Sequence, residues 1–332
     1  MKQMTSRERV LAAFQLKQPD QIPFMDDVGL EVREKIMGTT EYSDLEFSRR
    51  LGLDAMDLRT LEYWSPLFCN KIVKDGHEFL MDGLIKTEND LEIMVFPDPH
   101  DEKLYEPVKK FVEHYGKEDL ALYVYMTWGI DCVLHSMGIE TFSYALYDNL
   151  RLVEKVLDRY IEWNCSIVER LNSVGIDFIS TYNNIAYNSG PLVSPQIFRD
   201  VFVPKVKQIS DSCKIPWVFH SDGNIIPIMD DLLTLGMDCI HPIDPLSMNL
   251  KVIKETYGHK VCLWGNVDLT YALTRGTPED VEEEVLRCIK AAGANGGYIL
   301  GSANCLPHYV KTENVLAMAR GVKKYGKYPL NI

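Results

Sequence analysis

Two polar residues, His220 and Asp222, are the side chains of this sequence best suited to chemistry. They follow the apolar run 217–219 and precede Gly223, as in a buried strand that ends in a functional loop. A neutral imidazole, a carboxylate and a thiolate are all zinc ligands, and three protein ligands leave one position open for substrate. His220, Asp222 and Cys305 could therefore form a catalytic metal site. The alternative is a structural histidine hydrogen-bonded to Asp222, with Cys305 as a packing residue.

Polar side chains also follow other apolar runs. His241 and Asn266 each come after a short apolar segment, and Tyr182 and Asn183 close another. Phenol, amide and imidazole groups hydrogen-bond without a fixed charge, which suits them to an oxygenated small molecule. We therefore predict that these four residues bind the substrate. A rigid loop around Pro242 is the alternative for His241, and a hydrogen bond between loops is the alternative for Asn266.

Two adjacent carboxylates, Asp26 and Asp27, lie near the end of the first apolar segment. Neighbouring residues of a strand point to opposite faces, so only one of them should enter the interior. We assign Asp27 to the catalytic set with His220 and Asp222. Aromatic residues that either wall the site or belong to the core are Tyr63, Trp64, Phe68, Trp128, Tyr187 and Tyr309.

Short apolar strands alternate with amphipathic helices, which predicts a parallel sheet in an α/β fold. The eight candidate strands are residues 23–29, 54–60, 121–129, 177–183, 217–221, 238–243, 261–266 and 297–302. Eight such strands close a (β/α)8 TIM barrel, whose active sites lie at the carboxyl ends of the strands. We therefore expect His220, His241, Asn266 and Cys305 on one rim.

Residues 70–98 interrupt this alternation, because polar and apolar residues alternate there around Gly76 and Gly83. That pattern predicts an antiparallel β-hairpin inserted after the second strand, where it partly covers the barrel mouth. No low-complexity linker divides the chain. Residues 1–332 are therefore predicted to form a single domain.

The composition excludes several classes of partner. The 332 residues carry 35 Lys and Arg against 48 Asp and Glu, a net charge of −13, which argues against binding the phosphates of nucleic acid. No apolar run approaches the roughly 18 residues of a membrane span, and the N-terminus has no apolar signal core. The eight cysteines include no CxxC pair, which indicates reduced thiols and a cytoplasmic protein.

Several motifs together resemble the uroporphyrinogen decarboxylase-like superfamily, which includes cobalamin (corrinoid)-dependent methyltransferases. The motifs are Arg7-Glu-Arg-Val-Leu-Ala-Ala-Phe14, Gln18-Pro-Asp-Gln-Ile-Pro23, Gly190-Pro-Leu-Val-Ser-Pro195, His220-Ser-Asp-Gly-Asn224, Leu263-Trp-Gly-Asn-Val-Asp268, Gly276-Thr-Pro-Glu-Asp-Val281 and Glu313-Asn314. Their order and spacing extend over nearly the whole chain. The resemblance implies the same barrel that the strand pattern predicts.

Two differences between this sequence and the motifs of known members indicate the branch of the superfamily. Decarboxylases carry an arginine-rich segment after the first strand that grips the substrate's carboxylates, whereas residues 24–29 here contain no arginine. Zinc methyltransferases use a His-x-Cys motif and a later Cys; His220 and Cys305 resemble these positions, but Asp222 replaces the first Cys. A zinc ion bound by a carboxylate in place of that Cys would be a harder Lewis acid, which suits it to an ether oxygen rather than a thiolate.

The resemblance therefore implies a corrinoid-dependent methyltransferase. It would demethylate a small methylated substrate, such as a methoxylated aromatic, and pass the methyl group to Co(I) of a separate corrinoid protein, with zinc as a candidate cofactor. The first alternative is uroporphyrinogen decarboxylase or a related decarboxylase. The second is a catalytically silent barrel that serves as a binding component of such a system.

Overall fold

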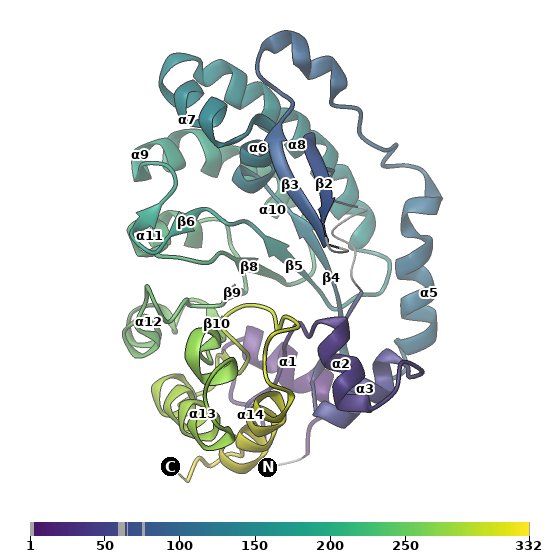
Figure 1. The fold of residues 1–332 in the computed structure, drawn as a ribbon, viewed down its shortest axis with the longest axis vertical. Coiled ribbons are helices and arrows are strands. Elements are labelled where there is room, and N and C mark those ends of the chain that lie inside the picture. Colours follow the sequence, from purple (N-terminus) through teal and green to yellow (C-terminus); the bar gives the residue numbers. More distant parts are fainter. Residues whose placement is uncertain (1–2, 59–63, 65, 75–76, 332) are drawn as a thin grey trace.

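A parallel sheet of seven strands forms the centre of the computed structural model, which describes residues 3–58, 64, 66–74 and 77–331 (Figure 1). In spatial order the strands are β1 (Ala55–Leu58), β4 (Ala121–Thr127), β5 (Phe178–Tyr182), β8 (Trp217–His220), β9 (Cys239–His241), β10 (Cys262–Trp264) and β11 (Tyr298–Ile299). Each strand lies within a predicted segment and pairs in parallel with its neighbours in this order. The predicted α/β class is therefore confirmed.

The predicted first strand, residues 23–29, is not a regular strand. It makes isolated bridges only, one of them between Phe24 and Leu300. It nevertheless bonds to both edges of the sheet: Leu300 N donates to Pro23 O at 2.9 Å, and Asp54 N donates to Phe24 O at 2.8 Å. Proline has no N–H to donate to a strand ladder, which limits pairing at this position. The prediction of eight regular strands is thus corrected to seven strands and one irregular segment between the edges.

Helices follow most of the strands (Figure 1). They are α1 (Ser6–Phe14), α2 (Leu30–Met37), α3 (Asp44–Leu51), α5 (Glu106–Tyr115), α6 (Ile130–Met137), α7 (Ile139–Asp148), α8 (Leu150–Leu171), α9 (Pro195–Ile197), α10 (Val203–Ser212), α11 (Met229–Leu233), α12 (Leu250–Tyr257), α13 (Pro278–Ala292) and α14 (Thr312–Tyr325). Short 3-10 or π segments are η1 (Glu88–Ile93), η2 (Glu102–Tyr105), η3 (Phe198–Phe202), η4 (Ile226–Ile228) and η5 (Leu269–Leu273). At the start of α13, Thr277 and Asp280 form a reciprocal capping box around the proline of the first turn.

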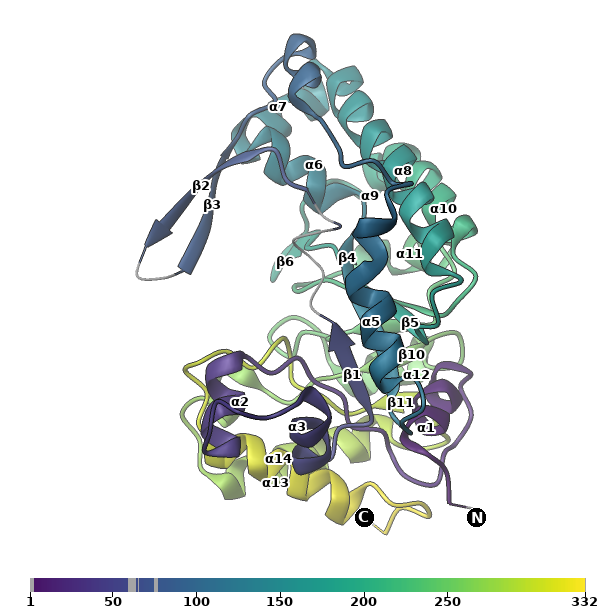
Figure 2. The same ribbon diagram turned by 90° about the vertical axis from the view of Figure 1, so that its right-hand side faces the viewer.

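Two strands after β1, β2 (Cys69–Lys74) and β3 (His77–Gly83), pair antiparallel, with Ile72 opposite Phe79. Residues 75 and 76 between them lie outside the described residues. Figure 2 shows the pair extending outward beyond the end of the central sheet. Gly83 fixes its base against the end of α6, since a Cβ there would lie 2.3 Å from Gly138 N. A second small sheet joins β6 (Ala186–Tyr187) and β7 (Gly190–Pro191).

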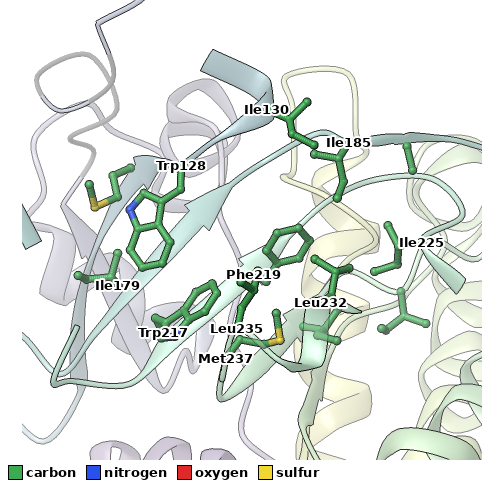
Figure 3. Packing of buried hydrophobic residues seen from close by; sticks show 14 of the residues in the cluster. Trp128, Ile130, Ile179, Ile185, Trp217, Phe219, Ile225, Leu232, Leu235 and Met237 are labelled. Atoms are coloured by element: carbon green, nitrogen blue, oxygen red, sulfur yellow. The ribbon is translucent and has the colours of Figure 1, made fainter. Parts of the chain in front are cut away.

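The hydrophobic core fills the space between the sheet and its helices, as the view in Figure 3 shows for one side. Trp128 and Trp217 pack with ring centroids 4.7 Å apart. Phe219 continues this layer from β8, and Leu232 meets it from α11. Buried apolar area of this kind is the main favourable contribution to folding, so these rings fix β4 and β8 relative to each other.

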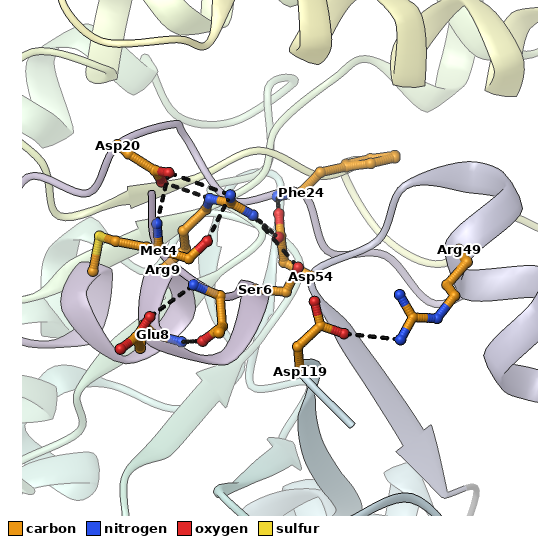
Figure 4. A network of polar contacts seen from close by, with 10 residues as sticks. Met4, Ser6, Glu8, Arg9, Asp20, Phe24, Arg49, Asp54 and Asp119 are labelled. Atoms are coloured by element: carbon orange, nitrogen blue, oxygen red, sulfur yellow. Dashed lines mark hydrogen bonds and ion pairs between the residues drawn. The ribbon is translucent and has the colours of Figure 1, made fainter. Parts of the chain in front are cut away.

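A polar network joins elements at the opposite end of the sheet from the site residues (Figure 4). Arg9 of α1 forms ion pairs with Asp20 at 2.6 Å and with Asp54 at 3.0 Å. Asp54 also accepts a hydrogen bond of 2.8 Å from Phe24 N. The guanidinium therefore ties α1 to both the irregular segment and the start of β1.

Among the described residues, no helix is both long and apolar enough to cross a membrane. All eight cysteines lie among the described residues and none is in a disulfide; five of them are buried: Cys69, Cys132, Cys239, Cys262 and Cys288. The thiols thus belong mainly to the packed interior, in keeping with the reduced state that the sequence indicates.

Candidate active site

Two histidines meet at the carboxyl ends of neighbouring strands. His220 ends β8, His241 ends β9, and the two are register partners. Their Nδ1 atoms lie 2.6 Å apart, and the residues are 1% and 5% exposed. Since β8 and β9 pair in parallel, the sheet itself positions the two rings side by side.

Two further aromatic rings, each tilted against its neighbour, hold these rings in place. The Tyr182 ring lies 4.3 Å from that of His220, and the Trp264 ring lies 4.2 Å from that of His241, on centroids. Trp264 Nε1 in turn donates to Met25 O at 2.9 Å. Four strands and the irregular segment therefore fix the ring planes.

Both imidazoles are neutral at ordinary pH. Burial lowers the pKa of His220 to about 3. Burial also lowers the pKa of His241 well below its usual range, and the neighbouring His220 lowers it further. The buried Nε2 atom of His220 has no hydrogen-bond partner among the described residues. A buried polar atom in that state is costly, so this nitrogen marks a place where a ligand could bind.

Asp222 lies beside that nitrogen. Its Oδ1 is 3.8 Å from His220 Nε2, and its Oδ2 accepts a hydrogen bond of 2.7 Å from Asn304 Nδ2. Burial raises the pKa of Asp222 to about 6, and the Asp244 carboxylate adds to the rise. Asp222 can therefore carry a proton close to neutral pH, as a general acid must.

The two carboxylates of the irregular segment have different surroundings. Asp27 is half-buried, and its charge is one cause of the raised pKa of Tyr182, after burial, so it faces the phenols of the interior. Asp26, which the sequence left without a role, is buried; it accepts a hydrogen bond of 2.8 Å from Ser302 N, and its other carboxyl oxygen is hydrogen-bonded to Ser302 Oγ at 2.8 Å. Burial raises the pKa of Asp26 to about 8.

Cys305 is half-buried, and its backbone N donates to Asn304 Oδ1 at 2.7 Å. It lies near enough to Tyr182 to contribute to the raised pKa of that phenol. In the part of the chain that the structure describes, however, no group of three or more His, Cys, Asp or Glu residues is placed to hold a metal ion. The structure thus brings His220 and Asp222 together but does not assemble them with Cys305 as a zinc site.

The two predicted substrate-binding amides make hydrogen bonds within the protein. Asn183 accepts from Trp128 N at 2.9 Å and donates to Thr181 Oγ1 at 2.9 Å. Asn266 donates to Ile243 O at 2.6 Å. Both side chains are buried, so they fix the loops after β5 and β10. For Asn266 this matches the inter-loop alternative.

A cavity of about 360 Å³ lies between the β2–β3 pair and the carboxyl ends of β4 and β5. Its lining residues are Pro66, Leu67, Lys71, Glu78, Leu80, Thr127, Asp131, His135, Tyr182 and Asn184. Tyr182 connects this cavity to the histidine pair, and Asn184 Oδ1 accepts from Asp222 N at 3.3 Å. The cavity is therefore next to the reactive groups.

The other predicted wall aromatics lie elsewhere. Trp64 and Trp128 are buried in the core, and Phe68 packs on Phe96 with centroids 5.3 Å apart. Tyr187 and Tyr309 are exposed, and Tyr63 lies outside the described residues. Asn304 is a site residue that sequence reasoning missed, although it directly precedes Cys305, which the sequence analysis selected.

A parallel, barrel-like sheet with ionisable groups at its carboxyl end defines an α/β enzyme. The chain belongs to the uroporphyrinogen decarboxylase (URO-D) family, whose model matches residues 79–325, and the family expected from the motifs is thereby confirmed. It is 24% identical to a uroporphyrinogen decarboxylase of Magnetococcus marinus over 297 residues, which cover 84% of this chain and 80% of that protein.

Methyltransferases are also among the relatives. The chain is 20% identical to the methylcobamide:CoM methyltransferase MtaA of Methanosarcina barkeri, over 98% of this chain and 99% of that protein. Among solved structures, a methyltransferase from Methanosarcina mazei has a TM-score of 0.79 at 19% identity, covering 97% of this chain and 99% of the other. That structural likeness shows the shared fold.

Proposed function

We propose that this protein is a corrinoid-dependent methyltransferase. It removes a methyl group from a small methylated donor, such as a methoxylated aromatic, and passes it to Co(I) of a corrinoid carried by a separate protein. The observation that carries the proposal is Asp222, a carboxyl group with a raised pKa beside the unpartnered Nε2 of His220. The nearly full-length similarity to a methylcobamide:CoM methyltransferase supports it.

The proposed chemistry uses Asp222 as the general acid. The electron pair of Co(I) forms the new bond to the methyl carbon, and the methyl C–O bond breaks with its electron pair left on oxygen. That oxygen takes the Asp222 proton, so a neutral phenol leaves instead of a basic phenolate. Positioned general acids typically contribute a rate factor of about 10²–10⁴.

The donor's ring would lie in the cavity between the β2–β3 pair and Tyr182. Pro66, Leu67 and Leu80 offer apolar surface there. Burial holds the pKa of Tyr182 well above its usual range, so its hydroxyl stays a neutral hydrogen-bond donor for the substrate oxygen. Zinc held by His220, Asp222 and Cys305 stays a prediction of the sequence, and because the described residues do not present that group, no step here depends on it.

The second candidate function is methyl transfer in the opposite direction, from a methylated corrinoid to an acceptor. The names of two relatives describe methylcobamide as the methyl source. The same carboxyl group would then accept the proton that an acceptor thiol or alcohol loses. Uroporphyrinogen decarboxylation is disfavoured, since residues 24–29 contain no arginine to bind the substrate's carboxylates.

The test uses purified full-length protein, reduced cob(I)alamin and a methoxylated benzoate, with the cobalt absorption spectrum as the readout. We expect methylcobalamin to form, and the rate to fall as the pH rises above about 6 because Asp222 then loses its proton. Asp222→Asn and His220→Ala should each lower the rate at least tenfold.

The matched control is Asp230→Asn, an exposed carboxylate of α11, which should leave the rate unchanged. Demethylation of methylcobalamin by a thiol, without the forward reaction, would support the second candidate instead. Release of carbon dioxide from uroporphyrinogen with no change at cobalt would overturn both.

A further inference from the structure

We propose that the β2–β3 hairpin carries a dimerisation surface through which two copies of this chain associate about a two-fold axis. The surface is centred on the exposed apolar residues Ile72, Phe79 and Met81, which we call the arm face. The proposal concerns assembly, so it is independent of the reaction that the protein catalyses.

The strand register divides the hairpin into two faces. Side chains alternate between the faces along a strand, and residues paired across antiparallel strands share a face. Lys71 pairs with Leu80, and both line the cavity of the candidate site. The next pair, Ile72 with Phe79, therefore points away from the cavity, and Met81 follows Phe79 on the same side. The hairpin is thus a thin wall, with the cavity on one side and the arm face on the other.

The arm face is apolar and yet exposed. Ile72 and Phe79 are each 47% exposed and Met81 is 48% exposed. None of the three packs against the hydrophobic core that the described residues form. The hairpin projects from the molecule (Figure 2), with its base anchored where Gly83 meets Gly138. A two-stranded hairpin is marginally stable in water without further packing, so an apolar face on its outer side marks an interaction surface.

A second exposed apolar surface begins at the base of the hairpin. A Cβ at Gly138 would lie 2.1 Å from Asp82 Oδ1, so the start of α7 touches β3. Ile139, Tyr144 and Tyr147 of α7 are all exposed. Large apolar side chains exposed to this extent offer roughly 100 Å² or more each, so these three and the arm face together approach the ~800 Å² per partner of a standard interface.

A second copy of the chain fits the arm face because the face is complementary to itself. A two-fold axis at the Ile72–Phe79 pair lays one hairpin antiparallel on the other, so the far end of each meets the base of its partner. Lys74, two residues beyond Ile72, brings an exposed ammonium to the far end. At the base lies Asp82, whose side chain is 66% exposed although it pairs with Lys86.

Lys74 therefore meets Asp82 of the partner subunit, while the apolar side chains of the two copies cover each other. Opposite charges at both ends of the contact offset the repulsion between two chains that each carry a net charge of −13. The dimer also supports the candidate site. One face of the hairpin lines the cavity, so a partner on the other face holds the cavity wall from outside.

The test is sedimentation velocity of the full-length protein over a concentration series, with circular dichroism to confirm folding. We expect a dimer. Ile72→Asp places a charge in the apolar contact of both subunits, so the dissociation constant should rise at least about tenfold. The matched control is Val73→Asp, because Val73 is the next residue of β2, is 74% exposed and points to the opposite face; this variant should dimerise normally. A monomer at every concentration, or equal effects of the two variants, would overturn the proposal.

A charge exchange tests the antiparallel arrangement by itself, should Ile72→Asp not fold. Lys74→Glu brings two acids together, so the dissociation constant should rise about tenfold. Adding Asp82→Lys to Lys74→Glu should restore most of the affinity. A double variant that dimerises no better than Lys74→Glu would contradict the proposed contact. Hydrogen exchange gives a second readout: the amides of β2 and β3 should exchange more slowly in the dimer than in monomeric Lys74→Glu, and equal rates would count against a covered hairpin.

Discussion

Asn304 donates a hydrogen bond of 2.7 Å to Asp222, a residue 82 positions earlier in the chain. This bond occupies Oδ2 and leaves Oδ1 facing His220 Nε2. The Asn304 backbone carbonyl in turn accepts from Ser302 Oγ at 2.6 Å, and Ser302 is bonded to Asp26. The reactive carboxyl group is thus oriented by the loop after β11, which the irregular first segment holds in place.

Asn304→Ala should change the pH dependence of methyl transfer. The hydrogen bond from Asn304 lowers the pKa of Asp222, so its removal should raise that pKa above its present value of about 6. A general acid with a higher pKa keeps its proton longer, so the loss of rate should move to higher pH. The maximal rate should fall about tenfold or more, because a hydrogen bond to a charged group contributes roughly 1.5–3 kcal/mol to its orientation.

A pH–rate profile measures both effects, and Asn149→Ala at an exposed position is the control. If the profile of Asn304→Ala coincides with that of the unmodified protein, Asp222 is not the acid.

Asp26 should make the fold less stable as the pH rises. Burial raises its pKa from 3.8 to about 8 in the folded protein. The folded state therefore holds a proton that the unfolded chain has lost, so this contribution is complete below pH 4 and is lost as the pH rises toward 8. The protonated form also fits its contacts, since its O–H can donate to Ser302 Oγ while Ser302 donates to Asn304 O.

Urea unfolding at pH 5 and pH 8 tests this. The free energy of unfolding should fall by up to a few kcal/mol between the two pH values for the unmodified protein. It should change less for Asp26→Asn, whose side chain stays neutral. The exposed-site variant Asp230→Asn should keep the full dependence; equal slopes for Asp26→Asn and the unmodified protein would contradict the assignment.

The strand pattern predicted seven strands correctly because buried parallel strands are continuous apolar runs. It was wrong at residues 23–29, where the sequence is equally apolar. There Pro23 cannot donate to a ladder, and Asp26 bonds to Ser302 across 276 positions of the chain. A contact at that sequence separation is set by tertiary packing, which no local pattern contains.

Part of the candidate site could be predicted from the sequence for a related reason. Polar residues after strands identified His220, Asp222 and His241, because parallel strands carry their carboxyl ends to one edge. The contact between the Nδ1 atoms of His220 and His241 could not be predicted, since it depends on the register of β8 with β9. The role of Asn304 could not be predicted either, because an amide in a loop of small residues forms no recognisable sequence motif.

Arg9→Ala should destabilise the protein more than removal of another arginine nearby. Arg9 pairs with Asp54, whose side chain is 5% exposed, and the substitution would leave that carboxylate without its cation. Breaking a buried pair in this way typically costs about 3–5 kcal/mol. Arg49, which is 52% exposed and pairs with Asp119, supplies the control, and Arg49→Ala should cost about 1 kcal/mol or less. Urea unfolding of both variants at pH 7 measures the difference, and equal losses would show that the network in Figure 4 contributes no more than a surface pair.

Leu80→Asp should weaken binding of an aromatic methyl donor. Leu80 lines the cavity beside Tyr182 and is itself partly exposed, so the fold should tolerate the change. A charge there would have to be desolvated against the donor's ring, and losing the apolar contact of one leucine costs about 1.5–3 kcal/mol, or roughly a tenfold to hundredfold rise in KM.

Val73→Asp is the matched control, because Val73 lies on the same β2–β3 pair but is exposed and does not line the cavity. Steady-state kinetics with the methoxylated benzoate should give a raised KM for Leu80→Asp alone. Similar KM values for the two variants would place the donor outside this cavity.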